Sequence, residues 1–296
     1  MTGTTSAGTV RLADDLVLTR MGCGAIQLAG PMAWGPPKDR DAAKSVLRAV
    51  VDLGITHIDT SDYYGPHTVN ELIRETLHPY PAGLHVVTKV GARRGPDKSW
   101  PAALSRDELV QAVHENLEHL GVESLDLVNL RMTDSREAAA ITGPFSVLAG
   151  LQQEGLIRHL GVSNVSAEQV AAAQSIAPVV AVQNFYNLAV RADDALVDQC
   201  AEQGIAFVPF FPLGGFRPLQ SGVLDKVAAG LGIPRLQVAL AWLLQRSPTI
   251  LLIPGTSSVA HLRENVGAAG VELPAQAVAA LNAAGTADRF APWEQR

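Results

Sequence analysis

The stretch HIDTSDYYG at residues 57–65 places an aspartate and a tyrosine five residues apart, directly after an apolar run. Asp59 ends the expected strand ITHID, and Tyr64 lies in the following loop. Lys89 stands at the end of the next expected strand, LHVVTKV. Turns are rich in Asp, Ser and Gly, so the stretch taken alone also fits an ordinary polar turn. Three such side chains at the ends of consecutive strands favour a catalytic site.

The chemistry available to these residues is proton transfer. A lysine in a partly desolvated place needs an anionic partner, and Asp59 is the nearest candidate for Lys89. A tyrosine has a pKa of about 10, and a nearby cation favours the phenolate and lowers that value. A decrease of about two to three, equivalent to roughly 3–4 kcal/mol, would let Tyr64 exchange a proton near neutral pH. The alternative is a buried Lys–Asp pair beside a surface tyrosine.

The elements that must position these residues alternate between β-rich runs and helical patterns. We expect a hairpin in TVRLADDLVLTR and strands in MGCGA, ITHID, LHVVTKV, LDLVNL, IRHLGVS, VVAVQ, IAFVPF and TILLIP. Strict alternation predicts a parallel sheet, and about eight units of this size predict an α/β fold of the (β/α)8 TIM barrel type. Strands such as VVAVQ are apolar throughout, as strands buried on both faces should be.

Helices are expected between the strands, at residues 39–53, 70–77, 106–120, 145–154, 166–174, 194–203, 236–246 and 258–267, with an extra C-terminal helix at 275–284. No linker-like segment divides the chain, so residues 1–296 are predicted to be a single barrel domain. An open dinucleotide-binding fold is the main alternative. Gly22 and Gly24 fit its glycine fingerprint, but Gln27 stands where the third glycine belongs.

Composition narrows the class of protein. The 296 residues are 47% hydrophobic and 18% charged, which is enough apolar material for a sizeable core. A net charge of −6 without a basic run argues against a nucleic-acid partner. The first residues do not resemble a secretory signal, and no apolar run has membrane-spanning length. Cys23 and Cys200 form no CxxC pair. We therefore expect a cytoplasmic protein without a membrane partner.

Six segments then carry a resemblance to a known family. GITHIDTSDYYG, VVTKVG, GVSN, VQNFYN, PFFPLGG and IPGTSSVAHLRENV resemble, in order, signature segments of the aldo-keto reductases, and most closely a bacterial subgroup linked to pyridoxal reduction. The resemblance implies a (β/α)8 barrel that binds NADPH across its mouth and transfers hydride to a carbonyl carbon. It also implies that Tyr64, rather than Tyr63, protonates the carbonyl oxygen, that Lys89 lowers the pKa of Tyr64, and that Asp59 holds Lys89.

One position departs from the family pattern. Where the family commonly has a histidine at the end of its fourth strand, LDLVNLR places Arg131. Arginine cannot relay a proton, but its planar fork can donate two hydrogen bonds. We expect Arg131 to select a substrate such as pyridoxal, whose aldehyde lies beside an acidic ring hydroxyl, and to stabilise charge on the carbonyl oxygen. The alternative is an ion pair at the rim.

The resemblance also implies a set of cofactor contacts. The segment IPGTSSVAHLREN combines a strand, a glycine turn and a helix N-terminus, which suits a phosphate. His261 stands where the family often has Arg or Gln, which softens the preference for NADP over NAD. The ring that stacks on nicotinamide is matched to Phe210, with Phe211 left open. The full set of implied contacts is Gly24, Ala25, Asp59, Ser163, Asn164, Gln183, Phe210, Leu213, Gly255, Thr256, Ser257, His261, Glu264 and Asn265.

The remaining histidines, among them His67, His114 and His119, show no metal-ligand spacing in the sequence, and we expect no metal. The predicted function is NADPH-dependent reduction of an aldehyde, with pyridoxal to pyridoxine as the expected reaction, by a monomer. The alternative is a nicotinamide-binding redox sensor or accessory subunit with little turnover. Arg131 keeps that alternative open.

Overall fold

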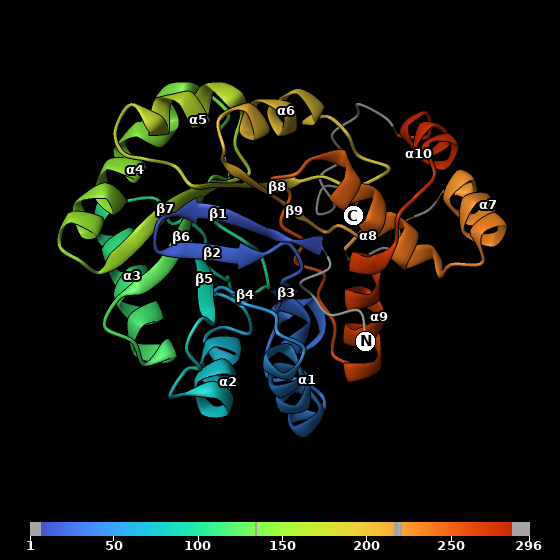
Figure 1. Cartoon of the computed structure of the whole chain (residues 1–296). Coiled ribbons are helices and arrows are strands. Elements are labelled where there is room, and N and C mark those ends of the chain that lie inside the picture. Colours follow the sequence, from blue (N-terminus) through green and yellow to red (C-terminus); the bar gives the residue numbers. More distant parts are fainter. Residues whose placement is uncertain (1–6, 134, 216–218, 220, 286–296) are drawn as a thin grey trace.

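The structure is a computed structural model that describes residues 7–133, 135–215, 219 and 221–285. Its centre is a sheet of seven parallel strands that follow one another in chain order (Figure 1). The strands are β3 (Cys23–Gly24), β4 (His57–Asp59), β5 (His85–Val90), β6 (Leu125–Arg131), β7 (Ile157–Ser163), β8 (Ala181–Phe185) and β9 (Ala206–Phe210). The ends of the predicted 1–296 domain lie outside the described residues, so the single domain stays a prediction.

The eighth side of the barrel is formed by residues 250–255. Ile250 bridges Phe207 of β9, while Leu252 bridges Met21 and Gly255 bridges Gly24, all in parallel. The predicted strand TILLIP is therefore present as isolated bridges rather than a regular strand, and it joins β9 to β3. The predicted (β/α)8 architecture is confirmed.

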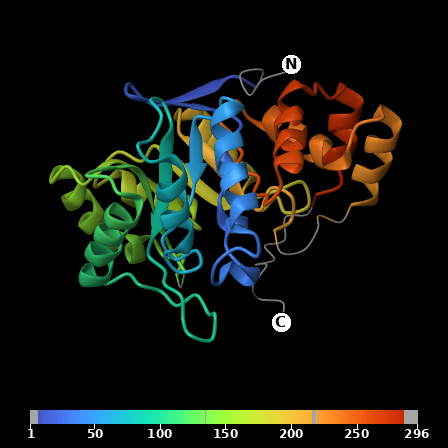
Figure 2. The ribbon, with the colours of Figure 1, turned by 90° about the horizontal axis from the view of Figure 1, so that it is seen from below.

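The predicted N-terminal hairpin is also present, as β1 (Thr9–Ala13) paired antiparallel with β2 (Leu16–Thr19). It lies across one end of the barrel, and the loop between β5 and α3 extends from the opposite end (Figure 2). Leu16 and Leu18 are almost fully buried and pack with Val87 and Leu127 in the barrel interior. The hairpin thus closes the amino end of the barrel, and the carboxyl ends of the strands remain for the site.

Helices surround the sheet (Figure 1): α1 (Arg40–Asp52), α2 (Thr68–Leu77), α3 (Arg106–Leu120), α4 (Ala138–Gln153), α5 (Ala167–Gln174), α6 (Asp194–Glu202), α7 (Gly222–Leu231), α8 (Arg235–Arg246), α9 (Val259–Gly267) and α10 (Ala275–Asn282). Short 3-10 turns are η2 (Ile26–Leu28), η3 (Pro31–Ala33) and η4 (Ala268–Gly270). The expected capping box of α5 is present, because Ser166 and Gln169 bond each other's backbone N–H groups. A second capping box, Ser105 with Glu108, begins α3.

Two helices differ from the expectation. Helix α4 begins at Ala138 and runs through Gly143 and Pro144, where local propensity predicts a break. Ile141 and Phe145, on either side of Gly143 and Pro144, are both fully buried. Their packing outweighs the local propensity, and the helix continues through these two residues. Helix α7 was not predicted; its small and mixed residues give a weak periodicity, and only its N-cap serine and C-cap Gly232 mark it.

Among the described residues, no single helix is both long and apolar enough to cross a bilayer, and α7 with α8 meets that criterion only as a pair bent by 99°.

Candidate active site

The ion pair predicted from the strand ends is present at the carboxyl ends of β4 and β5. Lys89 Nζ lies 2.6 Å from Asp59 Oδ1 and also donates to the backbone carbonyl of Thr60 at 2.8 Å. Both side chains are about 3–4% exposed. The parallel register of β4 and β5 places these two strand ends side by side. The lysine is therefore a desolvated cation held by the Asp59 carboxylate and the Thr60 carbonyl.

Tyr64 lies beside this cation. Lys89 Nζ is 5.1 Å from the centre of the Tyr64 ring, and Tyr64 as a whole is 8% exposed. The loop that carries Tyr64 is tied to β5, because Ser61 Oγ donates to the Lys89 carbonyl at 3.1 Å and Tyr64 N–H donates to the Ser61 carbonyl at 3.0 Å. Tyr64 is buried, and the alternative of a surface tyrosine is wrong.

The expected decrease in the Tyr64 pKa is not found. Burial raises the pKa of Tyr64 well above its usual range, the negative charge of Asp59 raises it further, and the Arg131 guanidinium only partly opposes them. Desolvation of the phenolate thus outweighs the attraction of the Arg131 guanidinium. Tyr64 is fully protonated at neutral pH, which is the form a proton donor needs.

The second tyrosine of the pair has a packing role. Burial raises the pKa of Tyr63 to about 12, and its ring meets Tyr64 and Trp100 edge-on, with centroids 5.4 and 5.6 Å apart. Arg94 lies over the Trp100 ring at 3.7 Å and over Trp34 at 5.4 Å. This guanidinium joins two loops that follow different strands. Sequence reasoning missed Arg94, which carries no motif of its own.

Gln183 and Asn129 extend the polar floor of the barrel. Gln183 Nε2 donates to Asp59 Oδ2 at 2.7 Å, so both carboxylate oxygens are occupied. Gln183 Oε1 and both amide atoms of Asn129 are buried without a hydrogen-bond partner among the described residues. Asn129 is the register partner of Lys89 on the adjoining strand. Buried polar atoms of this kind indicate a place where water or a ligand group binds.

Arg131 points across the mouth of the barrel. Its Nη1 donates to Ser163 Oγ at 3.2 Å, and its Cζ lies 4.9 Å from the Phe210 ring centre. It is half-buried and close enough to oppose the rise in the pKa of Tyr64. The guanidinium is thus held within the candidate site, beside the proposed proton donor.

The aromatic residues near Arg131 form a small cluster. Phe185 and Phe210 are nearly parallel, with centroids 5.7 Å apart, and Phe211 meets both rings edge-on. Phe210 is 8% exposed and Phe211, at a φ of 56°, is half-buried. Arg131 and Phe185 already contact the Phe210 ring. A nicotinamide stacked on Phe210 would therefore have to fit beside these two side chains. The stacking role stays a prediction.

Ser163 and Asn164 are already hydrogen-bonded to protein. Ser163 is fully buried and accepts from Arg131. Asn164 takes the left-handed conformation at φ 57°, donates to the Met132 carbonyl at 2.7 Å and accepts from Arg136 at 3.3 Å. Their side chains are therefore pre-positioned, and contact with a cofactor would use their remaining hydrogen-bonding capacity.

The two glycine positions lie where backbones approach closely. A Cβ on Gly24 would stand 2.5 Å from the Ile253 carbonyl oxygen, and one on Gly255 would stand 3.1 Å from the Gly24 carbonyl oxygen. The neighbouring Ala25 N–H donates to the Asp59 carbonyl at 2.8 Å. At Gly24 a side chain would clash with the opposite backbone, so glycine is needed there for the closure of the barrel beside Asp59.

Most of the remaining predicted contacts lie in α9 or just before it. Ser258 is the N-cap of this helix, and Thr256 Oγ1 accepts from the Ser258 N–H at 3.1 Å. Ser257 and His261 are exposed, Glu264 is half-buried, and Asn265 is buried. Leu213 lies apart from this helix, in the turn after β9, where its carbonyl accepts from Leu219. The open helix N-terminus can accept an anion.

The comparisons with known proteins decide the family. The Aldo/keto reductase family profile matches residues 20–286.

The chain belongs to the aldo/keto reductase family.

The chain is 58% identical to a pyridoxine 4-dehydrogenase of Escherichia coli (strain K12) over 269 residues, which are 90% of this chain and 94% of that protein. It is 40% identical to an uncharacterized oxidoreductase of Schizosaccharomyces pombe over 283 residues, or 95% and 91% of the two chains. A crystal structure of a thermostable aldo-keto reductase with the inhibitor epalrestat superimposes with a TM-score of 0.81 at 27% identity, covering 94% of this chain and 99% of that one. A Klebsiella pneumoniae aldo-keto reductase solved with NADPH shares the fold, with a TM-score of 0.75 at 24% identity and 93% and 94% coverage.

Within this aldo/keto reductase, the carboxyl ends of the strands bring together site residues that are far apart in the sequence. Asp59, Lys89 and Tyr64 form one group, and Arg131, Ser163 and Phe210 form another beside it. The arrangement places a phenol near a buried ammonium and a guanidinium, which suits protonation of an oxygen that gains negative charge.

Proposed function

We propose that this aldo/keto reductase reduces an aldehyde with NADPH, and that pyridoxal, converted to pyridoxine, is its best candidate substrate. The buried Lys89–Asp59 pair beside Tyr64 is the observation that carries the proposal. A buried charge pair costs desolvation free energy, and a function at the adjoining phenol explains why it is kept.

Tyr64 is the proposed proton donor to the carbonyl oxygen. NADPH, when bound, supplies the hydride. Tyr64 holds its proton at neutral pH because it is buried, and it releases that proton only as the carbonyl oxygen becomes basic. Lys89 stabilises the phenolate that forms, and Asp59 with Gln183 keeps the ammonium in place.

The chain offers a fitting cradle for a nicotinamide dinucleotide. The buried, unpartnered Oε1 of Gln183 can accept a hydrogen bond from a carboxamide. Gly24 and Gly255 allow close backbone approach, and the N-terminus of α9 suits the 2′-phosphate. We propose that these residues hold NADPH with the rest of the predicted contacts: Ala25, Ser163, Asn164, Phe210, Leu213, Thr256, Ser257, His261, Glu264 and Asn265.

Arg131 is the proposed substrate-selecting residue. It lies beside Tyr64, and its position is fixed by Ser163 and Phe210. Pyridoxal carries an aldehyde next to an acidic ring hydroxyl, and a guanidinium fork suits two neighbouring oxygens. The 58% identity to a protein named pyridoxine 4-dehydrogenase supports the same substrate.

The proposal is tested by following NADPH and NADH oxidation with pyridoxal and with benzaldehyde, scored as kcat/KM. We expect NADPH with pyridoxal to be preferred, and Arg131→His to lower kcat/KM for pyridoxal at least about tenfold more than for benzaldehyde. An equal change for both substrates would remove the selecting role of Arg131. NADPH binding without turnover of any aldehyde would instead support the redox-sensor alternative.

A monomeric, cytoplasmic enzyme without a nucleic-acid or membrane partner completes the proposal. Cys23 and Cys200 are free and buried, which suits a reducing compartment. Size-exclusion chromatography with light scattering tests the monomer directly.

A further inference from the structure

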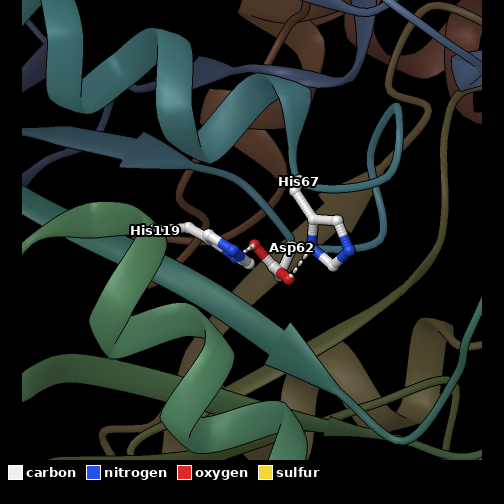
Figure 3. A group of neighbouring side chains, drawn as sticks. All are labelled: Asp62, His67 and His119. Atoms are coloured by element: carbon white, nitrogen blue, oxygen red, sulfur yellow. Dashed lines mark hydrogen bonds and ion pairs between the residues drawn. The ribbon is translucent and has the colours of Figure 1, made fainter.

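Asp62, His67 and His119 form a cluster on the outer side of the barrel, in the loop and helices next to Tyr64 (Figure 3). The two imidazole rings lie next to each other, with centroids 4.4 Å apart, and each meets a different oxygen of the Asp62 carboxylate. His67 Nδ1 lies 2.6 Å from Oδ2, and His119 Nδ1 lies 2.9 Å from Oδ1. His67 precedes α2 and His119 is in the last turn of α3, so only the fold brings them together. The spacing of the histidines in the sequence did not predict this group, because the three residues meet only in the folded chain.

We propose that the Asp62–His67–His119 cluster binds a divalent transition metal ion such as Zn²⁺. The ligand atoms are two imidazole nitrogens and one carboxylate oxygen, all within 4.8 Å of one another. Zn²⁺ takes these ligands at about 2.0–2.2 Å, so small side-chain rotations bring all three onto one ion. On binding, each Nδ1 presents its lone pair to the ion with the ring proton on Nε2, and an imidazolium releases its extra proton to solvent.

A second layer of hydrogen bonds holds the carboxylate ligand. Asn70 Nδ2 donates to Asp62 Oδ1 at 3.1 Å and to Asn116 Oδ1 at 3.0 Å. Thr60 donates to Asn70 Oδ1 at 2.8 Å, and Thr88 Oγ1 donates to Asn116 Oδ1 at 2.5 Å. Asn70 and Asn116 are buried. Metal ligands are commonly oriented by such outer hydrogen bonds, which here already exist around Asp62.

The cluster is accessible and lies in a negative environment. The side chain of His67 is 45% exposed and that of His119 is 20% exposed, while that of Asp62 is 8% exposed. An ion can therefore enter from the His67 side and keep a water ligand. The negative charges of Asp62, Glu115 and Glu71 lie near His67. The same charges attract a metal cation, which competes with the proton.

The position of the cluster connects a bound ion to the loop that carries Tyr64. Thr60 and Thr88, which support Asn70 and Asn116, directly adjoin Asp59 and Lys89 in the chain. Asp62 belongs to the same loop as Tyr64. A bound ion therefore stabilises the loop that carries the proposed proton donor. The site itself does not depend on the reductase activity, and its test needs no substrate.

The test uses the full chain, freed of metal with a chelator, and titrates it with Zn²⁺ by calorimetry and with Co²⁺ by visible absorption at pH 7.5. We expect one ion per chain. His67→Gln and His119→Gln keep a hydrogen-bond donor for Asp62 but remove a metal ligand, so each should weaken binding at least about tenfold. His114→Gln, on the exposed face of α3, should bind as the wild type does.

Three results would overturn the site: no saturable binding to the wild-type chain, equal affinity in all variants, or loss of affinity in His114→Gln alone. Circular dichroism confirms that each variant is folded. Because the two test variants lie at different helices, failure of one to fold leaves the other decisive. A cluster that is only hydrogen-bonded would give the first of these results.

Discussion

At the scale of single residues, the Lys89 ammonium donates hydrogen bonds to two oxygens, Asp59 Oδ1 and the Thr60 carbonyl. The pair is desolvated, so each charge depends on the other. The phenol of Tyr64 remains protonated because burial disfavours its anion. The cation therefore acts on the anion that forms during proton transfer rather than on the resting phenol.

Removing the cation tests this dependence. Lys89→Met leaves the buried carboxylate of Asp59 without its ion-pair partner, and we expect a loss of about 3 kcal/mol in the free energy of unfolding. We also expect kcat/KM for pyridoxal to fall at least about a hundredfold. Urea denaturation and steady-state kinetics measure the two effects.

The double variant Lys89→Met with Asp59→Asn is the control. It removes both charges, so it should recover part of the stability while the activity stays low. If Lys89→Met keeps wild-type kcat/KM, the cation has no part in catalysis.

At the scale of elements, the closure between β3 and residues 250–255 depends on glycine. Gly24→Ala would place a Cβ 2.5 Å from the Ile253 carbonyl oxygen. We expect this backbone clash to lower the free energy of unfolding by about 1–3 kcal/mol and to weaken NADPH binding, measured by urea denaturation and by fluorescence titration.

Gly150→Ala is the matched control for that substitution. Gly150 lies within α4, and nothing stands within 4 Å of its added Cβ. The substitution should raise the free energy of unfolding by about 0.5–1 kcal/mol, because alanine favours the helix. Equal destabilisation by both substitutions would show that the close approach at Gly24 is unimportant.

The elements also show what could be predicted from the sequence. The strand-end rule placed Asp59 and Lys89 together correctly, because parallel strands bring their carboxyl ends to one edge. Local sequence signals gave the wrong helix boundary where tertiary packing determines the structure, as at Pro144, which lies inside α4. The pairing of His67 with His119 depends on how α2 packs on α3, and no local pattern carries it. The direction of the Tyr64 pKa depends on burial, which spacing does not reveal.

At the scale of the whole molecule, the barrel interior buries a neutral histidine. His57 is 2% exposed, neither ring nitrogen has a hydrogen-bond partner among the described residues, and burial lowers its pKa to about 4. In the unfolded chain, a histidine has a pKa of about 6.5. Between these values the unfolded state binds more protons, so the free energy of unfolding falls as the pH falls from 6.5 to 4.

The contribution of His57 reaches about 3 kcal/mol at the acid end of this range. His57→Phe, which has a ring of similar size and no titration, should flatten this part of the pH dependence of the urea midpoint. The exposed His114→Gln variant should keep the wild-type slope. An unchanged slope in His57→Phe would assign the acid sensitivity to other groups.

The proposed chemistry depends most on the Tyr64 phenol beside the buried Lys89 ammonium, and one measurement tests this role directly. Tyr64→Phe removes the hydroxyl and leaves the ring that packs against Tyr63. With NADPH affinity checked by fluorescence, we predict that kcat/KM for pyridoxal falls at least about a hundredfold while NADPH still binds. Turnover by Tyr64→Phe at the wild-type rate would contradict the proposed proton donor.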